Sequence, residues 1–284
     1  MKSVLVTGAN GQLGQCIQKI QAAHSDINFH FASIDELDIT DTQKVQEFFL
    51  KNSYDYCVNC AAYTNVELAE SEEDKAYLVN AEAAKNLAKA CADNKVTMIH
   101  ISTDYVFDGT KTTPYLETDA TNPISVYGAS KLKGEQNVQA VSEKYFIIRT
   151  SWLYAEFGKN FYKTMLQKAK EKANLTITTE QTGTPTNAND LAALIVKIIN
   201  TNNTNYGIYH FSNDGEATWY DFTKEIIQNM HLAEADQPSL KPVDSYKTKA
   251  ARPKNSVLDK TKVRSIIETI SWQESLRNLM KNSN

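Results

Sequence analysis

Tyr127 and Lys131 stand four residues apart in "VYGASKLKGE", residues 126–135. Residues i and i+4 are neighbours on a helix, so a helix here places a phenol beside an ammonium group. A cation close to a tyrosine favours the phenolate and lowers its pKa from the usual value of about 10. The spacing therefore makes Tyr127 a candidate proton donor and Lys131 the group that tunes it. An ordinary amphipathic helix with a solvated lysine is the alternative.

Three glycines form a second pattern with chemical meaning. In "TGANGQLG", Gly8, Gly11 and Gly14 recur every three residues, between the apolar run "SVLVT" and a helical pattern. Such a loop permits a tight turn and a close backbone approach to a pyrophosphate, which the amides at the helix N-terminus then face. We expect a dinucleotide-binding loop here, with a purely structural glycine turn as the alternative.

The elements that must position these residues alternate along the first half of the chain. Strand-like apolar runs occupy residues 3–7, 28–32, 56–61, 96–102 and 145–149, with helical patterns between them, including a long one from about 72 to 92. This alternation predicts an α/β fold with a Rossmann-type doubly wound parallel sheet. Ligands of such sheets bind at the carboxyl ends of the strands, where this sequence gathers polar and aromatic residues.

The alternation loosens after about residue 152, which predicts a second, smaller unit. We expect residues 1–152, with about 185–201, to form the dinucleotide-binding domain, because "NDLAALIVKIIN" is an apolar helix suited to pack on the sheet. Residues of about 153–184 and 205–284 are expected to form a smaller C-terminal substrate-binding lobe. "NNTNYG" is interpreted as the linker between them.

Composition excludes several classes of protein. The 284 residues carry a formal net charge of −4, which argues against a nucleic-acid binder that relies on bulk basicity. We find neither the ~18 apolar residues of a membrane span nor a secretory signal, so no membrane partner and a cytoplasmic location are expected. Cys57 and Cys60 form C-x-x-C in a strand-like run, which favours buried structural cysteines over a redox pair. The five histidines show no ligand spacing, so no metal site is expected.

The spacing G-x-x-G-x-x-G with a downstream Y-x-x-x-K resembles the short-chain dehydrogenase/reductase superfamily, whose extended members act on nucleotide sugars. Further segments occur in order along nearly the whole chain: "GANGQLGQ", "NCAAYTNVELAESE", "ISTDYVFDG", "NPISVYGASKLKGE", "IRTSWLY", "GKNFYKTML", "GTPT" and "ARPKNSVLD". This ordered set resembles the dTDP-4-dehydrorhamnose reductase family. The resemblance implies reduction, with NADPH or NADH, of the C4 ketone of dTDP-4-dehydro-L-rhamnose to dTDP-L-rhamnose.

The resemblance also assigns roles to residues. Tyr127 is the implied proton donor or acceptor, and Lys131 holds the nicotinamide ribose while lowering the pKa of the phenol. Thr103 completes the implied catalytic set by hydrogen bonding to the substrate carbonyl or to Tyr127, with Ser102 as a substitute. Asn80 supports the site. The implied cofactor-binding residues are Gly8, Gly11, Gln12, Leu13, Gly14, Asp38, Ile39, Ala61, Ala62, Tyr63, Tyr127 and Lys131.

The substrate side follows from the same resemblance. Its implied residues are Thr103, Asp104, Tyr105, Tyr127, Trp152, Asn160 and Arg252. Related dehydratases carry an Asp-Glu pair where this chain has Asp104 and Tyr105, and a phenol cannot replace that carboxylate base, so simple reduction is favoured. Trp152 has domain packing as an alternative role, and Arg252 a surface salt bridge. Glu67 and Glu180 stand where aspartate is usual, which leaves their partners open.

Cofactor choice, metal and assembly complete the expectations. No arginine follows the second strand to meet a 2′-phosphate, so we expect use of both NADPH and NADH. Gln15 replaces an acidic residue of some relatives, so their magnesium arrangement is not expected. A homodimer is a candidate assembly, and a dTDP-sugar is the expected small-molecule partner.

Two alternative functions remain. One is a non-catalytic subunit resembling the regulatory subunit of methionine adenosyltransferase, and the other is a reductase or epimerase of another nucleotide sugar.

Overall fold

The computed structural model describes residues 1–233 and 236–281. Its centre is a six-stranded sheet in the order β10-β5-β4-β3-β1-β2, in which all neighbouring strands pair in parallel. The strands are β1 (Lys2–Thr7), β2 (Ile27–Ala32), β3 (Tyr56–Asn59), β4 (Thr97–Thr103), β5 (Tyr145–Thr150) and β10 (Gly207–His210). The predicted α/β fold with a parallel sheet is confirmed. The strand order reverses direction beside β1, where such sheets bind ligands.

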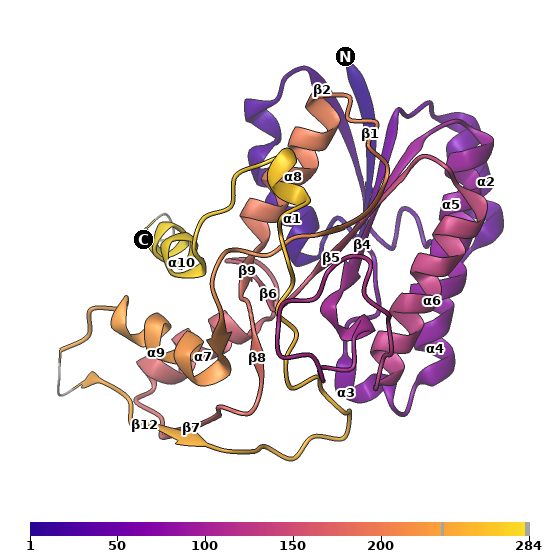
Figure 1. The fold of residues 1–284 in the computed structure, drawn as a ribbon. Helices are drawn as coiled ribbons and strands as arrows, with labels where there is room; N and C mark the ends of the chain where they lie inside the picture. Colours follow the sequence, from indigo (N-terminus) through magenta and orange to yellow (C-terminus); the bar gives the residue numbers. More distant parts are fainter. Residues whose placement is uncertain (234–235, 282–284) are drawn as a thin grey trace.

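Helices cover both faces of this sheet (Figure 1). On one face lie α1 (Gln12–Ile20) and α8 (Ala188–Asn200), and on the other α2 (Thr42–Lys51), α5 (Ala83–Asp93) and α6 (Val126–Val141). Alternate residues of a strand point to opposite faces, and Val4 and Leu5 accordingly join different apolar cores. The apolar helix expected to return to the sheet is α8, whose leucines and isoleucines pack in the first core.

The long helix expected at 72–92 is present as one continuous helical segment that contains a wider, π-helical turn. It comprises α4 (Glu73–Tyr77), a π-helical turn at Leu78–Glu82, and α5. A short helix, α3 (Val66–Ala69), precedes it. Wide turns of this kind are frequent near functional sites. This one carries Asn80, whose side chain is buried against α6.

The smaller lobe is built from α7 (Phe161–Lys170), α9 (Trp219–Gln228) and α10 (Trp272–Lys281), which share a core of aromatic and aliphatic residues. Three two-stranded pairs connect it: β6 (Leu153–Tyr154) with β9 (Thr186–Asn187), β7 (Leu175–Thr178) with β12 (Leu240–Val243), and β8 (Thr182–Gly183) with β11 (Ala217–Thr218). Short 3₁₀ turns, η1 (Gln21–Ala23), η3 (Asp104–Val106) and η5 (Val263–Ser265), complete the described elements.

One boundary of the sequence interpretation is wrong. Residues 205–284 were expected in the smaller lobe, yet β10 within that range pairs with β5 and forms an edge of the large sheet. The strand is short and follows an Asn-rich stretch, so its pattern resembles a linker. The remaining division into two domains is a proposal.

Two smaller findings concern the cysteines and the membrane. Cys57 and Cys60 are free thiols that pack into the cores on opposite faces of the sheet, as a strand places residues i and i+3. Within residues 1–233 and 236–281, no helix is both long and apolar enough to cross a membrane.

Candidate active site

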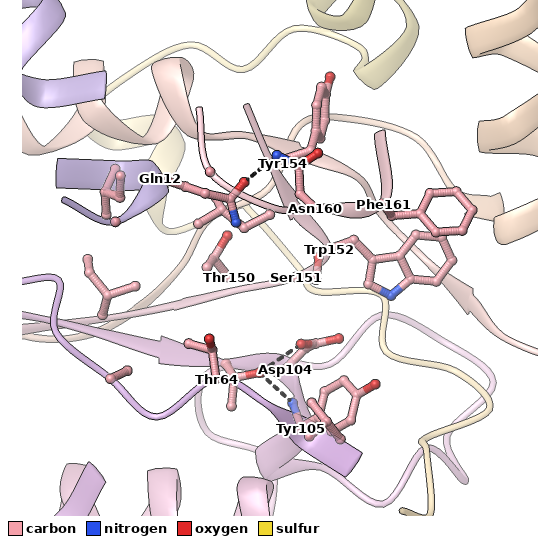
Figure 2. A pocket seen from close by; sticks show the side chains of 18 of the residues that line it. Gln12, Thr64, Asp104, Tyr105, Thr150, Ser151, Trp152, Tyr154, Asn160 and Phe161 are labelled. Atoms are coloured by element: carbon pink, nitrogen blue, oxygen red, sulfur yellow. Dashed lines mark hydrogen bonds between the residues drawn. The ribbon is translucent and has the colours of Figure 1, made fainter. Parts of the chain in front are cut away.

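A cavity of about 620 Å³ opens at the carboxyl ends of β1, β3, β4 and β5, between the sheet and the smaller lobe (Figure 2). Twelve of the residues expected from sequence line it: Gly11, Gln12, Leu13, Ala62, Thr103, Asp104, Tyr105, Tyr127, Lys131, Trp152, Asn160 and Arg252. The fold therefore brings the implied catalytic, cofactor and substrate groups to one place. Gly8, Gly14, Asp38, Ile39, Ala61 and Tyr63 are not among the lining residues.

Helix α6 carries Tyr127 and Lys131 into the cavity. Ser125 caps its N-terminus by accepting a hydrogen bond from the amide of Gly128 at 3.2 Å. Two glycines let the helix approach its neighbours: a Cβ on Gly128 would lie 2.2 Å from the carbonyl oxygen of Tyr105, and one on Gly134 would lie 2.1 Å from that of Asn80. The close packing places Tyr127 edge-on against Tyr105, with ring centroids 5.6 Å apart.

Burial dominates the electrostatics of this pair. Desolvation raises the pKa of Tyr127 above its usual value, and an interaction with Thr103 opposes only part of the rise. Lys131 is 2% exposed and its Nζ donates to the carbonyl oxygen of Ile101 at 2.6 Å. Burial lowers the pKa of Lys131 to about 8, while the carboxylate of Glu135 acts in the opposite direction. The phenol pKa thus shifts opposite to the predicted direction, because burial removes the phenol from solvent and Lys131 is not among the groups that act on it.

The end of β4 supplies the other polar groups. Thr103 Oγ1 donates to Asp104 Oδ1 at 3.0 Å and accepts from the amide of Tyr105 at 3.2 Å. Asp104 is 2% exposed, and burial raises its pKa to about 6. Its Oδ2 has no hydrogen-bond partner among the described residues. Ser102, the expected substitute for Thr103, instead donates to Glu135 at 2.5 Å.

The glycine loop has the geometry that a pyrophosphate site needs. Gly8 has φ +67°, and a Cβ there would lie 2.6 Å from the amide nitrogen of Ala61. A Cβ on Gly14 would lie 2.6 Å from the carbonyl oxygens of Gly8 and Ala9. Gly11 is different, since its nearest obstacle is one oxygen at 3.1 Å. Gly11 is also the N-cap of α1 and gives the helix no side-chain cap, so the first amides face the cavity and fit a dinucleotide phosphate.

Four residues expected at the cofactor have other partners in the structure. Asp38 accepts from the amide and hydroxyl of Thr40, at 2.9 and 2.7 Å, which lowers its pKa. The hydroxyl of Tyr63 donates to Glu72 at 3.0 Å. Ile39 is buried in the core beneath α2, and the backbone of Ala61 packs on Gly8. Contacts of these residues with a cofactor remain a proposal.

Asn80 braces the loop that follows β3. Its Oδ1 accepts from the amide of Tyr63 at 2.8 Å, and its Nδ2 donates to the carbonyl of Tyr63 and to Ser130 Oγ, both at 3.0 Å. Ser130 lies on α6 between Tyr127 and Lys131. The side chain therefore ties this loop to the helix that carries the proposed catalytic residues, which is the expected kind of support.

Aromatic side chains form the wall on the side of the smaller lobe. Trp152 has φ +45°, an uncommon conformation for a bulky residue, and stacks on Trp219 with centroids 3.7 Å apart and planes 6° apart. Gly183 makes room for it, because a Cβ there would lie 2.7 Å from the indole. Sequence reasoning missed Trp219 and its neighbour Phe161. The T-x-x-D capping box at Thr218 marks the start of α9 and is the signal that could have placed Trp219.

Arg252 forms the salt bridge considered from sequence, and its contact with a substrate diphosphate remains a proposal. Its Nη2 donates to Glu67 Oε1 at 2.6 Å and its Nη1 to the hydroxyl of Tyr105 at 3.3 Å. It also lines the cavity, and its buried Nε has no partner among the described residues. Glu67 thus finds its partner in Arg252, and Glu180 forms an ion pair with Lys254 at 3.6 Å.

Asn160 connects the smaller lobe to the glycine loop. Its Nδ2 donates to Gln12 Oε1 at 2.8 Å, and its Oδ1 accepts from the amide of Lys163 at the start of α7 (Figure 2). One side chain therefore caps a helix of the smaller lobe and contacts the proposed cofactor loop.

The chain matches the family model described as RmlD substrate binding domain over residues 1–284. It is 37% identical to the dTDP-4-dehydrorhamnose reductase of Aggregatibacter actinomycetemcomitans, over 98% of each chain. It is 38% identical to the spore coat polysaccharide biosynthesis protein SpsK of Bacillus subtilis, over 99% of this chain and 98% of the other. A solved dTDP-4-dehydrorhamnose reductase of Bacillus anthracis, in complex with NADP, superposes with a TM-score of 0.94 at 38% identity, over 99% of each chain. The chain belongs to the RmlD family, as its full-length match and the dTDP-4-dehydrorhamnose reductases among its relatives show.

Proposed function

We propose that this protein reduces the C4 ketone of dTDP-4-dehydro-L-rhamnose to give dTDP-L-rhamnose, with NADPH or NADH as the reductant. The observation that carries the proposal is that one cavity is lined both by the uncapped start of α1 and by Tyr127, Lys131 and Thr103. Relatives named as dTDP-4-dehydrorhamnose reductases, one of them solved with NADP, support the same reaction.

The residues of the chain divide the work of such a reduction. A bound reduced nicotinamide supplies the hydride that C4 receives. Tyr127 donates its proton to the oxygen that becomes the C4 hydroxyl, and its raised pKa keeps that proton in place until negative charge develops there. The hydroxyl of Thr103 orients the same oxygen. Lys131 lies one helical turn away, where its ammonium group can hold the nicotinamide ribose.

The other walls of the cavity suit a nucleotide sugar. Arg252 presents an Nε that has no partner within residues 1–233 and 236–281, and it can exchange part of its hydrogen bonding with Tyr105 for a diphosphate oxygen. Trp152 and Trp219 offer an apolar surface to the deoxysugar or the base. Tyr105 stands at a position where a carboxylate base would promote loss of water, and its phenol has its own pKa raised to about 12 by burial. The site therefore favours reduction without elimination.

The test is an assay with purified protein, dTDP-4-dehydro-L-rhamnose and either NADPH or NADH. We expect loss of the reduced nicotinamide absorbance with both cofactors, and NMR of the product should identify dTDP-L-rhamnose. Cofactor binding without oxidation would instead support the non-catalytic subunit. Faster oxidation with another 4-keto nucleotide sugar, or a product of different C4 configuration, would assign a different reductase or epimerase activity.

A further inference from the structure

Glu135 lies one helical turn beyond Lys131 on α6 and is 1% exposed. Its Oε1 accepts from Ser102 Oγ at 2.5 Å and from Arg149 Nε at 2.9 Å. Its Oε2 accepts from Arg149 Nη2 at 2.7 Å and from Nε at 3.2 Å. A fully buried carboxylate thus joins α6 to both β4 and β5.

The negative charge of Glu135 and the positive charge of Arg149 balance each other, because the aromatic rings beside Arg149 are uncharged. Arg149 is 2% exposed, and its guanidinium lies 5.1 Å from the ring centroid of Phe107. Its Nη1 lies 3.4 Å from His210 Nε2, and burial lowers the pKa of that histidine to about 3, so the ring is neutral. Burying an ion pair contributes little net stability compared with apolar residues of the same size. Fold stability alone therefore gives a weak reason for this arrangement.

Three consecutive residues of β4 contact the three chemically important positions of α6. The carbonyl oxygen of Ile101 accepts from Lys131, the hydroxyl of Ser102 donates to Glu135, and Thr103 interacts with Tyr127. The positions on α6 are spaced by four residues, so they lie along one face of the helix. Glu135 and Lys131 are therefore neighbours in one row of side chains that β4 contacts.

The charge that Lys131 experiences comes from Glu135. The other titratable groups that act on or face it are neutral near pH 7: burial raises the pKa of the Cys60 thiol at the end of β3 and lowers that of the His100 imidazole on β4. The phenol of Tyr127 on α6 is neutral as well. Glu135 favours the ammonium form of Lys131, against the effect of desolvation.

We propose that Glu135 is a positioning residue of the proposed reductase: it keeps Lys131 an ammonium group, and Arg149 limits how strongly it does so. The proposal rests on the proposed function for its kinetic readout. A purely structural role would not predict the following contrast. Removing Glu135 should make Lys131 lose its proton at lower pH, whereas removing Arg149 should make Lys131 keep its proton to higher pH.

The experiment compares Glu135→Gln with Arg149→Met at saturating NADPH, using the alkaline limb of the pH profile of kcat/KM. Glu135→Gln removes the attraction and leaves the charge of Arg149, so the limb should move to lower pH by about one unit. Arg149→Met leaves the carboxylate unpaired beside Lys131, so the limb should move to higher pH by a similar amount. The double variant should return towards the parent profile.

Controls separate charge from folding. Glu135→Asp retains the carboxylate, so its limb should stay near that of the parent even if its thermal unfolding temperature falls. Limbs that stay fixed in both single variants, or move in the same direction, would overturn the proposal. If Glu135→Gln does not fold, the upward shift in Arg149→Met and the unmoved limb in Glu135→Asp decide the question. The pH dependence of NADPH affinity in the same variants needs no substrate, so it tests the inference even where the proposed sugar is not reduced.

Discussion

Tyr127 is subject to two opposing influences on its acidity. The interaction with Thr103 favours the phenolate, whereas desolvation favours the neutral phenol and outweighs it in the structure. For a reduction, the neutral phenol is the useful form, because the donor must keep its proton until the carbonyl oxygen gains negative charge. The residue is therefore prepared to act as an acid at neutral pH.

Tyr127→Phe removes that proton and little else. We expect turnover to fall by about 10²–10⁴-fold, the usual contribution of general acid catalysis. NADPH affinity should stay close to that of the parent, since the ring and Lys131 remain. Steady-state kinetics and a fluorescence titration with NADPH measure the two quantities, and near-parental turnover would remove Tyr127 from the mechanism.

Lys131→Met tests the second member of the pair through pH. The pKa of about 8 places the loss of the ammonium group just above neutrality, so parent activity should be full below that pH and decline as the pH rises through it. The methionine has no such group, so the residual activity should persist to higher pH, and NADPH affinity should fall. An unchanged profile with unchanged affinity would assign Lys131 to an ordinary buried helix face.

At the scale of elements, the glycines at the junction between β1 and α1 are of two kinds. One faces open space apart from a single carbonyl oxygen, and the other packs closely against the backbone. Gly11→Val places a side chain on the open side of the loop, where a pyrophosphate would approach. We expect a folded protein that no longer binds NADPH. Circular dichroism and a fluorescence titration check the fold and the binding, and intact NADPH binding by the folded variant would contradict the assigned loop.

The matched control is Gly14→Val, three residues further on in the first turn of α1. Its Cβ would lie 2.6 Å from two backbone carbonyl oxygens, so α1 would have to move away from the loop. We expect this variant to unfold at lower temperature than Gly11→Val, or to fail to fold. Equal stability of the two variants would mean that the loop adjusts to either side chain.

Local patterns predicted the elements that hold the catalytic residues but not all of their surroundings. The five strands with strong apolar runs and the helix of Tyr127 were found, because periodicity is a local property. The short β10 was missed, since its strand character comes from pairing with β5. Sequence also could not show the stack of Trp152 on Trp219, because it joins residues far apart in the chain, nor the desolvation that sets the pKa of Tyr127.

At the scale of the whole molecule, buried histidines link stability to pH. His210 is 0% exposed, and its pKa of about 3 lies below the usual 6.5. Between these values the unfolded chain binds a proton that the folded chain does not, so stability is present above pH 6.5 and is lost as the pH falls towards 3. The slope for one such histidine is at most about 1.4 kcal/mol per pH unit.

Urea unfolding at several pH values between 7 and 4 measures this dependence. His210→Asn removes the titrating ring, so we expect a smaller loss of stability per pH unit than in the parent, whatever its stability at pH 7. His231 is exposed, and His231→Asn should leave the slope unchanged. Identical slopes in all three proteins would exclude His210 as a source of acid sensitivity.

The late position of α8 and β10 in the chain affects how the protein can be made. A ribosome completes β1 to β5 long before residues 188–210 emerge, and until then the core that contains Val4, Val58 and Ile148 lacks one of its two helices, α8. The nascent chain therefore carries an apolar half-sheet while the segment between residues 153 and 187 is still being synthesised. Such a surface promotes aggregation. A gene fragment ending at residue 152 should accordingly yield insoluble protein, even though it encodes the glycine loop, Tyr127 and Lys131.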